Sequence, residues 1–168
     1  MQTMKSTMKY AIVVCATSIS PAFADPLINY AQTLFNESVA YVDEVEEKCY
    51  ANLSALPDDV FEDVNITNDE TRIVLQYFYT KNLTDCTAPS VKNFLVSAST
   101  LSALDSKRSE DIRESIELVI HTNLSKLKAE FEYIQLSDSL KNQLDSIDVL
   151  QRPFDLMASI RKHYQPEK

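Results

Sequence analysis

The chain has 168 residues, and none of them is glycine. Dinucleotide-binding turns, phosphate-binding loops and nucleophile elbows need positions that only glycine occupies at low cost, because the backbone has a positive φ or a ligand approaches it closely. Tight β-hairpins also lose their favoured turn residue. A helical protein can do without glycine when asparagine or a frayed end closes each helix. The composition therefore disfavours these enzyme classes and extensive antiparallel sheets, and it predicts an all-α fold.

Residues 109–136 form the longest stretch with a single apolar period. Its apolar positions recur at steps of three and four residues, which places them on one side of a helix. The positions are Ile112, Ile116, Val119, Ile120, Asn123, Leu124, Leu127, Phe131 and Ile134. Because such a face is not stable alone in water, we expect the other helices to pack around this one.

The remaining helices are predicted from local start and stop signals. Asp25 and Pro26 open a first helix that ends near residue 53, and a capping box at Thr67 introduces a second. This second helix is expected over residues 72–82, with Asn82 as its terminator. The next, opened by Thr87, Ala88 and Pro89, is expected over residues 87–105, which places Cys86 in the loop before it. The last is expected over residues 137–150, capped by Ser137 and Asp138, and Pro153 breaks or kinks it. We therefore predict one domain over residues 25–168, an antiparallel bundle of four or five helices.

Residues 56–66 form an acidic connector without a regular apolar period. Its apolar residues, Val60, Phe61, Val64 and Ile66, suggest that the connector lies against the helices. The carboxylates between Asp58 and Asp63 could in principle hold a calcium ion. However, the ligand order and the glycine of an EF-hand are both absent, so a plain acidic loop is the preferred interpretation.

Residues 1–24 have the features of a cleaved secretory signal. Lys5 and Lys9 precede a short apolar core, and the sequence Ala-Phe-Ala at residues 22–24 resembles a signal-peptidase site. A retained membrane anchor would need about 20 apolar residues, roughly twice the length of this run. Cys15 lacks the small preceding residue of a bacterial lipoprotein signal, so we expect it to leave with the leader and no stable membrane insertion to follow.

The charge of the chain argues against nucleic acid and anionic membranes as partners. The formal net charge is −9, and loss of Lys5 and Lys9 with a leader that contains no acidic residue changes it to −11. Binding to phosphate-rich surfaces needs an excess of Lys and Arg instead.

Two cysteines, Cys49 and Cys86, remain after the leader is removed. In an oxidising compartment a disulfide between them is the simplest interpretation, and it would stabilise the fold by about 4 kcal/mol according to loop-closure entropy. A redox-active or metal-binding pair is the alternative, but such pairs usually have a short spacing.

No pattern in the chain predicts a metal or cofactor site. The histidines are His121 and His163. Glu117 and His121 lie four residues apart, whereas di-iron helical proteins repeat Glu-x-x-His on two helices. A solvated pair is therefore preferred over a metal ligand. Haem held by Met157 and a histidine is the remaining alternative, although Met and His on helices are usually packing and surface residues.

Five glycosylation sequons occur among nine asparagines, more than chance would give, which favours a eukaryotic secreted protein. They lie at Asn36, Asn52, Asn65, Asn82 and Asn123. Asn123, however, lies in the apolar stripe of residues 109–136, where a sugar would block packing. A core-face asparagine more naturally sets helix register. Together with the cleavage site, this favours a bacterial periplasm.

These features predict a secreted or periplasmic helical binding or interaction protein without catalytic activity or cofactor. Its partner would be another protein or an apolar small molecule. The first alternative is a carrier that holds an apolar small molecule inside the bundle. The second is a hydrolase using paired carboxylates, for which the 25 acidic residues provide many chance pairs but no sign of a cleft.

Overall fold

The computed structural model describes residues 21–51 and 53–164, and every regular element in these two ranges is helical. The elements are α1 (Pro21–Tyr50), α2 (Asn68–Leu104), α3 (Ser109–Ile134), α4 (Asp138–Asp145), the 3₁₀ helix η1 (Asp148–Gln151) and α5 (Leu156–His163). The predicted all-α class is confirmed. Most of the predicted leader, residues 1–20, and the predicted frayed tail, residues 165–168, lie outside the described residues.

Helix α1 begins earlier than its start signal indicates. The sequence places Pro26 at the first helical position, but the helix starts at Pro21 and contains Pro26. The Ala-Phe-Ala sequence thus lies in the first turn of α1. Cleavage after Ala24 would return Asp25 and Pro26 to the N-terminus of the helix, where a proline costs no intrahelical hydrogen bond.

Helix α2 replaces two predicted helices. The sequence predicts that one helix ends at Asn82, that another starts at Thr87 and that Cys86 lies in the loop between them; the structure has one helix through all three residues. The hydroxyls of Thr84 and Thr87 donate to carbonyl oxygens one turn earlier, over 2.7 and 3.0 Å. Their polar groups are therefore satisfied inside a helix, which removes the reason to break it there.

Asn82 has a tertiary role in place of its predicted role as a helix terminator. Its side chain is buried, and its amide nitrogen donates to the carbonyl oxygens of Leu150 and Arg152 at 2.8 and 2.9 Å. These bonds join the middle of α2 to η1 and the residue after it. Contacts 68 and 70 residues away thus override the local preference of asparagine for helix ends.

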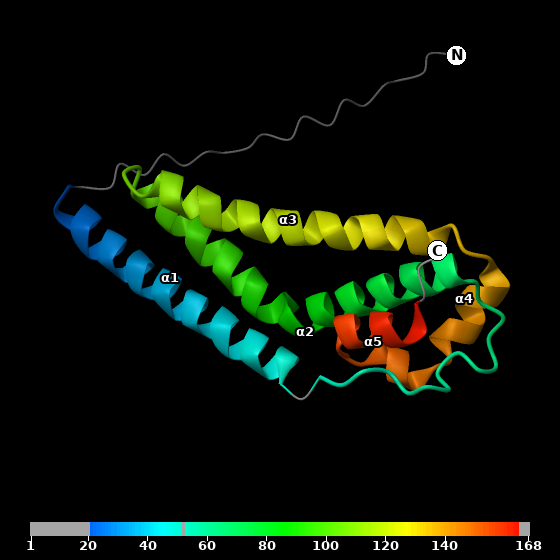
Figure 1. The fold of residues 1–168 in the computed structure, drawn as a ribbon. Coiled ribbons are helices and arrows are strands. Elements are labelled where there is room, and N and C mark those ends of the chain that lie inside the picture. The colour runs from blue at the N-terminus through cyan, green and yellow to red at the C-terminus, as the bar shows by residue number, and fades with distance from the viewer. Residues whose placement is uncertain (1–20, 52, 165–168) are drawn as a thin grey trace, which may run out of the picture.

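Helix α2 bends in its middle (Figure 1). Pro89 lies inside the helix, where it cannot donate to the carbonyl of Asp85 and its ring crowds the preceding turn. A sharp helix bend is usually found at such a proline. The predicted role of Pro89 as part of a helix start is therefore wrong.

Helix α2, and not α3, is the central element. It packs against α1, α3, α5 and η1, and α1, α2 and α3 run in alternating directions (Figure 1). Helix α1 follows the C-terminal half of α2 and ends near the bend, whereas α4, η1 and α5 gather near its N-terminal half. The expectation that the other helices surround α3 is wrong, because α3 contacts mainly α2.

Buried side chains form two clusters, which we call the large core and the small core. The large core contains Leu56, Val74, Leu75, Phe78, Tyr133, Leu140, Leu144, Leu150 and Phe154. The small core contains Ala31, Phe94, Ala98, Leu101 and Ile112. The first joins the connector, α2, α3, α4, η1 and the residues before α5, whereas the second joins only α1, α2 and α3.

The connector lies on the large core, as its apolar residues predict. Val60, Phe61, Val64 and Ile66 all pack against this cluster. Ser159 ties it down, since the buried hydroxyl accepts from the Leu56 amide at 3.0 Å.

Several predicted boundaries are also confirmed. Thr67 and Glu70 form the capping box of α2, with Glu70 N donating to Thr67 Oγ1 over 3.3 Å and Thr67 N donating to the Glu70 carboxylate over 2.9 Å. Ser137 caps α4 by accepting from Leu140 N at 3.2 Å. Pro153 lies between η1 and α5, where the chain breaks as predicted.

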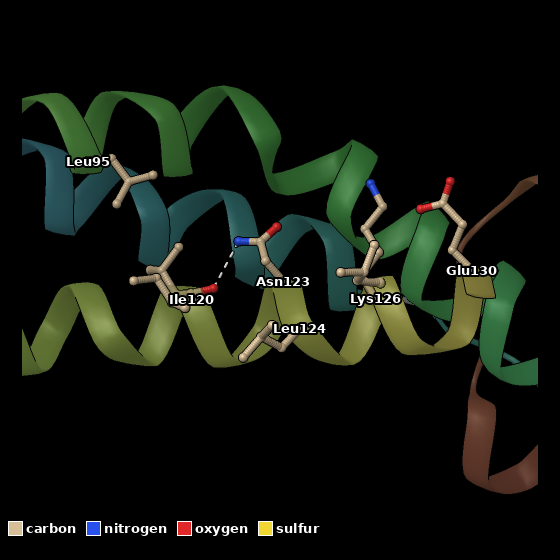
Figure 2. A pocket seen from close by; sticks show the side chains of 8 residues that line it. Leu95, Ile120, Asn123, Leu124, Lys126 and Glu130 are labelled. Atoms are coloured by element: carbon tan, nitrogen blue, oxygen red, sulfur yellow. Dashed lines mark hydrogen bonds between the residues drawn. The ribbon is translucent and has the colours of Figure 1, made fainter. Parts of the chain in front are cut away.

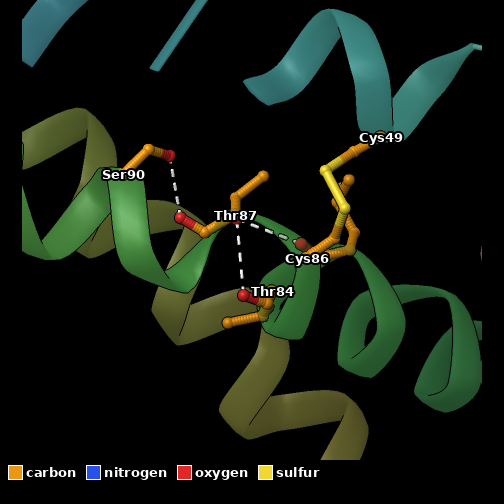
Figure 3. Close-up of a disulfide and its surroundings, with 6 residues drawn as sticks. Cys49, Thr84, Cys86, Thr87 and Ser90 are labelled. Atoms are coloured by element: carbon orange, nitrogen blue, oxygen red, sulfur yellow. Dashed lines mark hydrogen bonds between the residues drawn. A yellow bond between two sulfur atoms is a disulfide. The ribbon is translucent and has the colours of Figure 1, made fainter. Parts of the chain in front are cut away.

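Cys49 and Cys86 lie at disulfide distance, with their sulfur atoms 2.00 Å apart and their Cα atoms 6.2 Å apart. Figure 3 shows the bond between the end of α1 and the middle of α2. The second cysteine is three residues before Pro89, so the disulfide holds α1 at the bend of α2. Both sulfurs belong to helices, whereas the sequence placed Cys86 in a loop.

Candidate functional site

Helix α3 carries two apolar faces of different character. The first belongs to the small core, where α3 packs on α2, and contains the buried Ile112 with the partly buried Ile116 and Val119. The second, which we call the α3 strip, is between 51 and 63 % exposed. The strip consists of Ile120, Leu124, Leu127, Phe131 and Ile134. The predicted stripe is therefore covered in its N-terminal half only.

The spacing within the α3 strip is that of a coiled-coil seam. From residue 120 the members follow at steps of four, three, four and three. A repeat of 3.5 residues keeps one narrow line of side chains facing a partner helix. Within residues 120–134, the residues that face α2, such as Ala129 and Tyr133, are buried and lie outside this line. The strip is thus a second face and not an extension of the first.

A groove of about 400 Å³ runs beside the strip, between α3 and the bent α2. Leu95 of α2 and Val119, Ile120, Leu124 and Leu127 of α3 provide its apolar lining. Figure 2 shows Leu95 and Ile120 toward one end, and Lys126 and Glu130 toward the other. The groove and the strip share Ile120, Leu124 and Leu127, so they form one continuous apolar surface.

The groove continues into a smaller, polar hollow of about 170 Å³. Lys126 and Glu130 line both spaces, and Tyr77, Thr80, Lys81 and Asp85 of α2 complete the smaller one. Lys81 and Asp85 form an ion pair at 3.4 Å. The apolar surface is therefore bordered at this end by charges of both signs.

Helices α2 and α3 are held together on both sides of the groove. At one end they are joined by a short connection, residues 105–108. At the other end the rings of Tyr77 and Tyr133 stack with centroids 3.8 Å apart, and Arg72 pairs with Glu132 at 3.7 Å. Because α2 and α3 are attached to each other at both ends, the bend of α2 separates them in between. The groove is therefore part of the fold.

Tyrosines near the bend and in the large core titrate abnormally. Burial, followed by the neighbouring Tyr79, raises the pKa of Tyr50 to about 12. Burial and then Asp145 raise the pKa of Tyr133, whose hydroxyl donates to that carboxylate over 3.1 Å, and burial also raises the pKa of Tyr77. These phenols are protonated at neutral pH, which suits packing and hydrogen bonding.

The two histidines lie on different helices, His121 on α3 and His163 on α5. His121 is exposed on α3. The carboxylate of Glu117, its predicted partner, forms an ion pair with the Arg113 guanidinium at 3.7 Å. His163 packs edge-on against Phe61, with ring centroids 5.5 Å apart. Within the parts of the chain that the structure describes, no three His, Cys, Asp or Glu side chains come together as a possible metal site.

In the acidic connector, Asp58 pairs with Lys162 at 2.8 Å, and the Lys162 ammonium also donates to the Leu56 carbonyl over 2.9 Å. This carboxylate thus helps to attach the connector to α5. Among the described residues, the acidic segment does not bring three carboxylates together as a cation site.

The buried sequon is Asn82, and not Asn123 as the sequence suggests. Asn123 is exposed, and its amide donates to the Val119 carbonyl at 2.9 Å, so the argument that a sugar there would block packing is wrong. Asn82 is the buried sequon, and its two hydrogen bonds leave no room for a sugar. Asn36 and Asn65 are exposed. Asn52 lies outside the described residues.

Sequence reasoning missed that the stripe of α3 is two faces. The signal was present, since the residues of the α3 strip keep a strict alternation of four and three while Ile112, Ile116 and Val119 form a parallel series one position earlier. The groove had no such signal, because it depends on the bend at Pro89. No helix in the described ranges is long and apolar enough to span a membrane.

Comparison of the chain with models of protein families, with curated proteins and with solved structures finds no match.

Proposed function

We propose that the protein is a non-catalytic binding protein, exported to the periplasm or the extracellular space, whose docking surface is the α3 strip with the adjoining groove. One observation carries this proposal: five large apolar side chains stand half exposed at coiled-coil spacing on a helix that is otherwise anchored. Together they leave about 500 Å² of apolar surface, near the top of the range for the largest patch on a monomer. The largest patch on a monomer is often functional.

The disulfide supports the proposed compartment. Disulfides persist in oxidising environments and are rare in the cytosol, where thiols are kept reduced. The Cys49–Cys86 pair is therefore compatible with export, as is the predicted leader. The periplasm remains our preferred location because of the Ala-Phe-Ala sequence and because the buried Asn82, in place of Asn123, is a sequon that cannot carry a sugar.

A carrier of an apolar small molecule is the second candidate. The groove volume of about 400 Å³ falls within the range of small-molecule pockets. Such sites normally enclose most of their ligand, whereas this groove is open to solvent along the exposed α3 strip. The shape therefore favours a helix laid along the groove over a small molecule within it.

Native mass spectrometry of the protein from its own compartment tests the proposal. We expect the wild-type chain to appear with a bound protein chain, and the double variant Leu124→Asp/Leu127→Asp to appear alone. Leu118→Asp is the matched control, because Leu118 is 70 % exposed on the same helix but lies outside the strip. A small-molecule adduct in place of a protein partner would favour the carrier. The proposal would be refuted if the wild-type chain, like the double variant, showed neither a bound protein nor a bound small molecule.

A further inference from the structure

Building on the proposed docking surface, we infer that the occupant of the α3 strip is the α3 strip of a second copy of this chain. The two helices run antiparallel, with Leu124 of one copy beside Leu127 of the other.

The spacing requires a helical occupant. Alternating steps of four and three keep the side chains in register with the a and d positions of a facing helix. A pairing strand would need a period of two, and a small molecule would impose no repeat over 15 residues. The strip extends from Ile120 to Ile134, so it provides two complete heptads for helix–helix contact.

The strip matches itself when two copies are related by a two-fold axis. If the axis passes between residues 125 and 126, Leu124 meets Leu127 and Ile120 meets Phe131, and each contact occurs twice. Four apolar pairs then form the centre of an isologous interface, the commonest kind in soluble dimers. At the edge of this interface, Ile134 of one copy lies beside Glu117 of the other. That carboxylate is paired with Arg113 of its own chain at 3.7 Å.

The local charge permits this approach although the whole chain is acidic. Residues 117–134 contain three acidic residues and two lysines, so their formal charge is −1, whereas that of the chain is −9. In the proposed register Asn123 lies near Glu130 of the second copy, and no carboxylate faces another carboxylate. The strip is therefore a place where two acidic molecules can meet with little repulsion.

The area is adequate for a dimer of modest affinity. Two strips would bury about 1,000 Å² of apolar surface, and the flanking polar residues would bring the total near the 1,200 Å² lower bound of specific interfaces. The partner helix would also cover the mouth of the groove, because Ile120, Leu124 and Leu127 belong to both surfaces.

Sedimentation velocity over a range of concentrations tests self-association. We expect a monomer–dimer equilibrium whose dissociation constant rises by about 100-fold in Leu124→Asp/Leu127→Asp, since these residues form the centre of the interface. Leu118→Asp should leave the constant within a few-fold of wild type. Equal far-UV circular dichroism and melting curves for all three proteins would show that the variants are folded.

Cysteine cross-linking tests the register. The variants Leu124→Cys and Leu127→Cys should form little intermolecular disulfide separately, but a mixture of the two should form a heterodimer, because only residues 124 and 127 meet across an antiparallel seam. Cross-linking of each variant with itself would indicate a parallel seam and overturn the inference. A chain that is monomeric at all concentrations but binds another protein through the strip would overturn self-pairing and leave the proposed function intact. A monomer with no partner would refute both.

Discussion

The two cores of this protein show how the number of converging elements decides whether an apolar face becomes buried. At the large core, α2, α3, α4, η1 and the connector meet, and Val74, Leu75, Phe78, Leu144 and Leu150 have no exposed surface. At the small core only three helices meet, and α1 leaves Leu27 and Leu34 more than a third exposed. Helices with similar apolar patterns thus have different burial at the two ends.

The physical reason is geometric. Three helices with α2 in the middle can cover both sides of α2 but only one side of α1 and one of α3. Additional elements from the C-terminal 30 residues close the large core, and no helix within residues 21–51 and 53–164 covers the outer side of residues 120–131 of α3. The exposed strip is therefore a consequence of the architecture and not of a weak apolar pattern.

The sharpest test of this contrast is Phe78→Ala in the large core. Phe78 is fully buried and meets Tyr77 and Tyr133 at ring-centroid distances of 5.0 and 5.6 Å. We expect a loss of about 5 kcal/mol in the free energy of unfolding, measured by denaturant titration, because the surrounding elements cannot collapse into the cavity. Phe94→Ala in the small core should cost about 3 kcal/mol, since three helices relax more easily. Equal losses would contradict the difference between the cores.

The disulfide should have the next largest effect. The double variant Cys49→Ala/Cys86→Ala releases α1 from the bend of α2 and should lower the free energy of unfolding by about 4 kcal/mol, from the loop-closure entropy of the unfolded chain. Reduction of the wild-type protein should reproduce this loss, whereas reductant should not affect the variant. A loss below about 1 kcal/mol would mean that α1 is held by its packing alone.

The polar link between α2 and η1 is tested by Asn82→Leu. The substitution leaves the carbonyls of Leu150 and Arg152 without the donor that they have in the wild type. Loss of the donor to the buried Leu150 carbonyl and the partly buried Arg152 carbonyl should cost about 2–3 kcal/mol in the same denaturant assay. The exposed α2 position Asn93 supplies the control, because Asn93→Leu should change stability by less than about 0.5 kcal/mol.

Tyr133→Phe should cost about 1 kcal/mol near pH 7, the net contribution of one hydrogen bond. It should also change the alkaline limb of the stability profile. Because burial raises the pKa of the folded Tyr133 phenol, its contribution is fully present below the unfolded tyrosine pKa of about 10 and is lost as pH rises above that value.

The wild-type free energy of unfolding should therefore fall more steeply above pH 10 than that of Tyr133→Phe. Tyr30, which is exposed on α1, supplies the control near pH 7, where Tyr30→Phe should change the free energy of unfolding by less than about 0.5 kcal/mol. Parallel alkaline limbs for wild type and Tyr133→Phe would show that this phenol does not govern the profile.

The smallest effect is expected on the α3 strip. Leu127→Gln should change the free energy of unfolding of the monomer by less than about 0.5 kcal/mol, because the side chain is 61 % exposed. The measurement should be made at low protein concentration, where self-association does not contribute. A large loss in the monomer would show that the strip is covered by its own chain, and would remove the contrast between the cores.

Much of the local structure could be predicted from the residues. The capping box at Thr67, the cap at Ser137, the break at Pro153 and the pairing of Cys49 with Cys86 agree with the structure, because each depends on neighbouring residues or on the chemistry of two thiols. The two errors in α2 arose where long-range contacts outweighed local preference. Asn82 is held inside the helix by carbonyls of η1, and Pro89 bends a helix that its neighbours on both sides stabilise.

The candidate site was only half predictable. The apolar residues of α3 were identified correctly, but the expectation that they are buried is wrong for five of the eight, which form the exposed α3 strip. The groove beside them depends on the path of α2 and on Tyr77 and Tyr133 closing one end, neither of which has a local signature.

The sequence by itself determined the helical class, several capped helix ends and the covalent link between two segments, because hydrogen bonds within a helix, caps and thiol chemistry are local properties of the chain. Only the tertiary structure decided which apolar faces are buried. That outcome depends on how many elements reach each face, and the bend of α2 with the placement of the C-terminal helices sends them to one end of the molecule and leaves the face of α3 open.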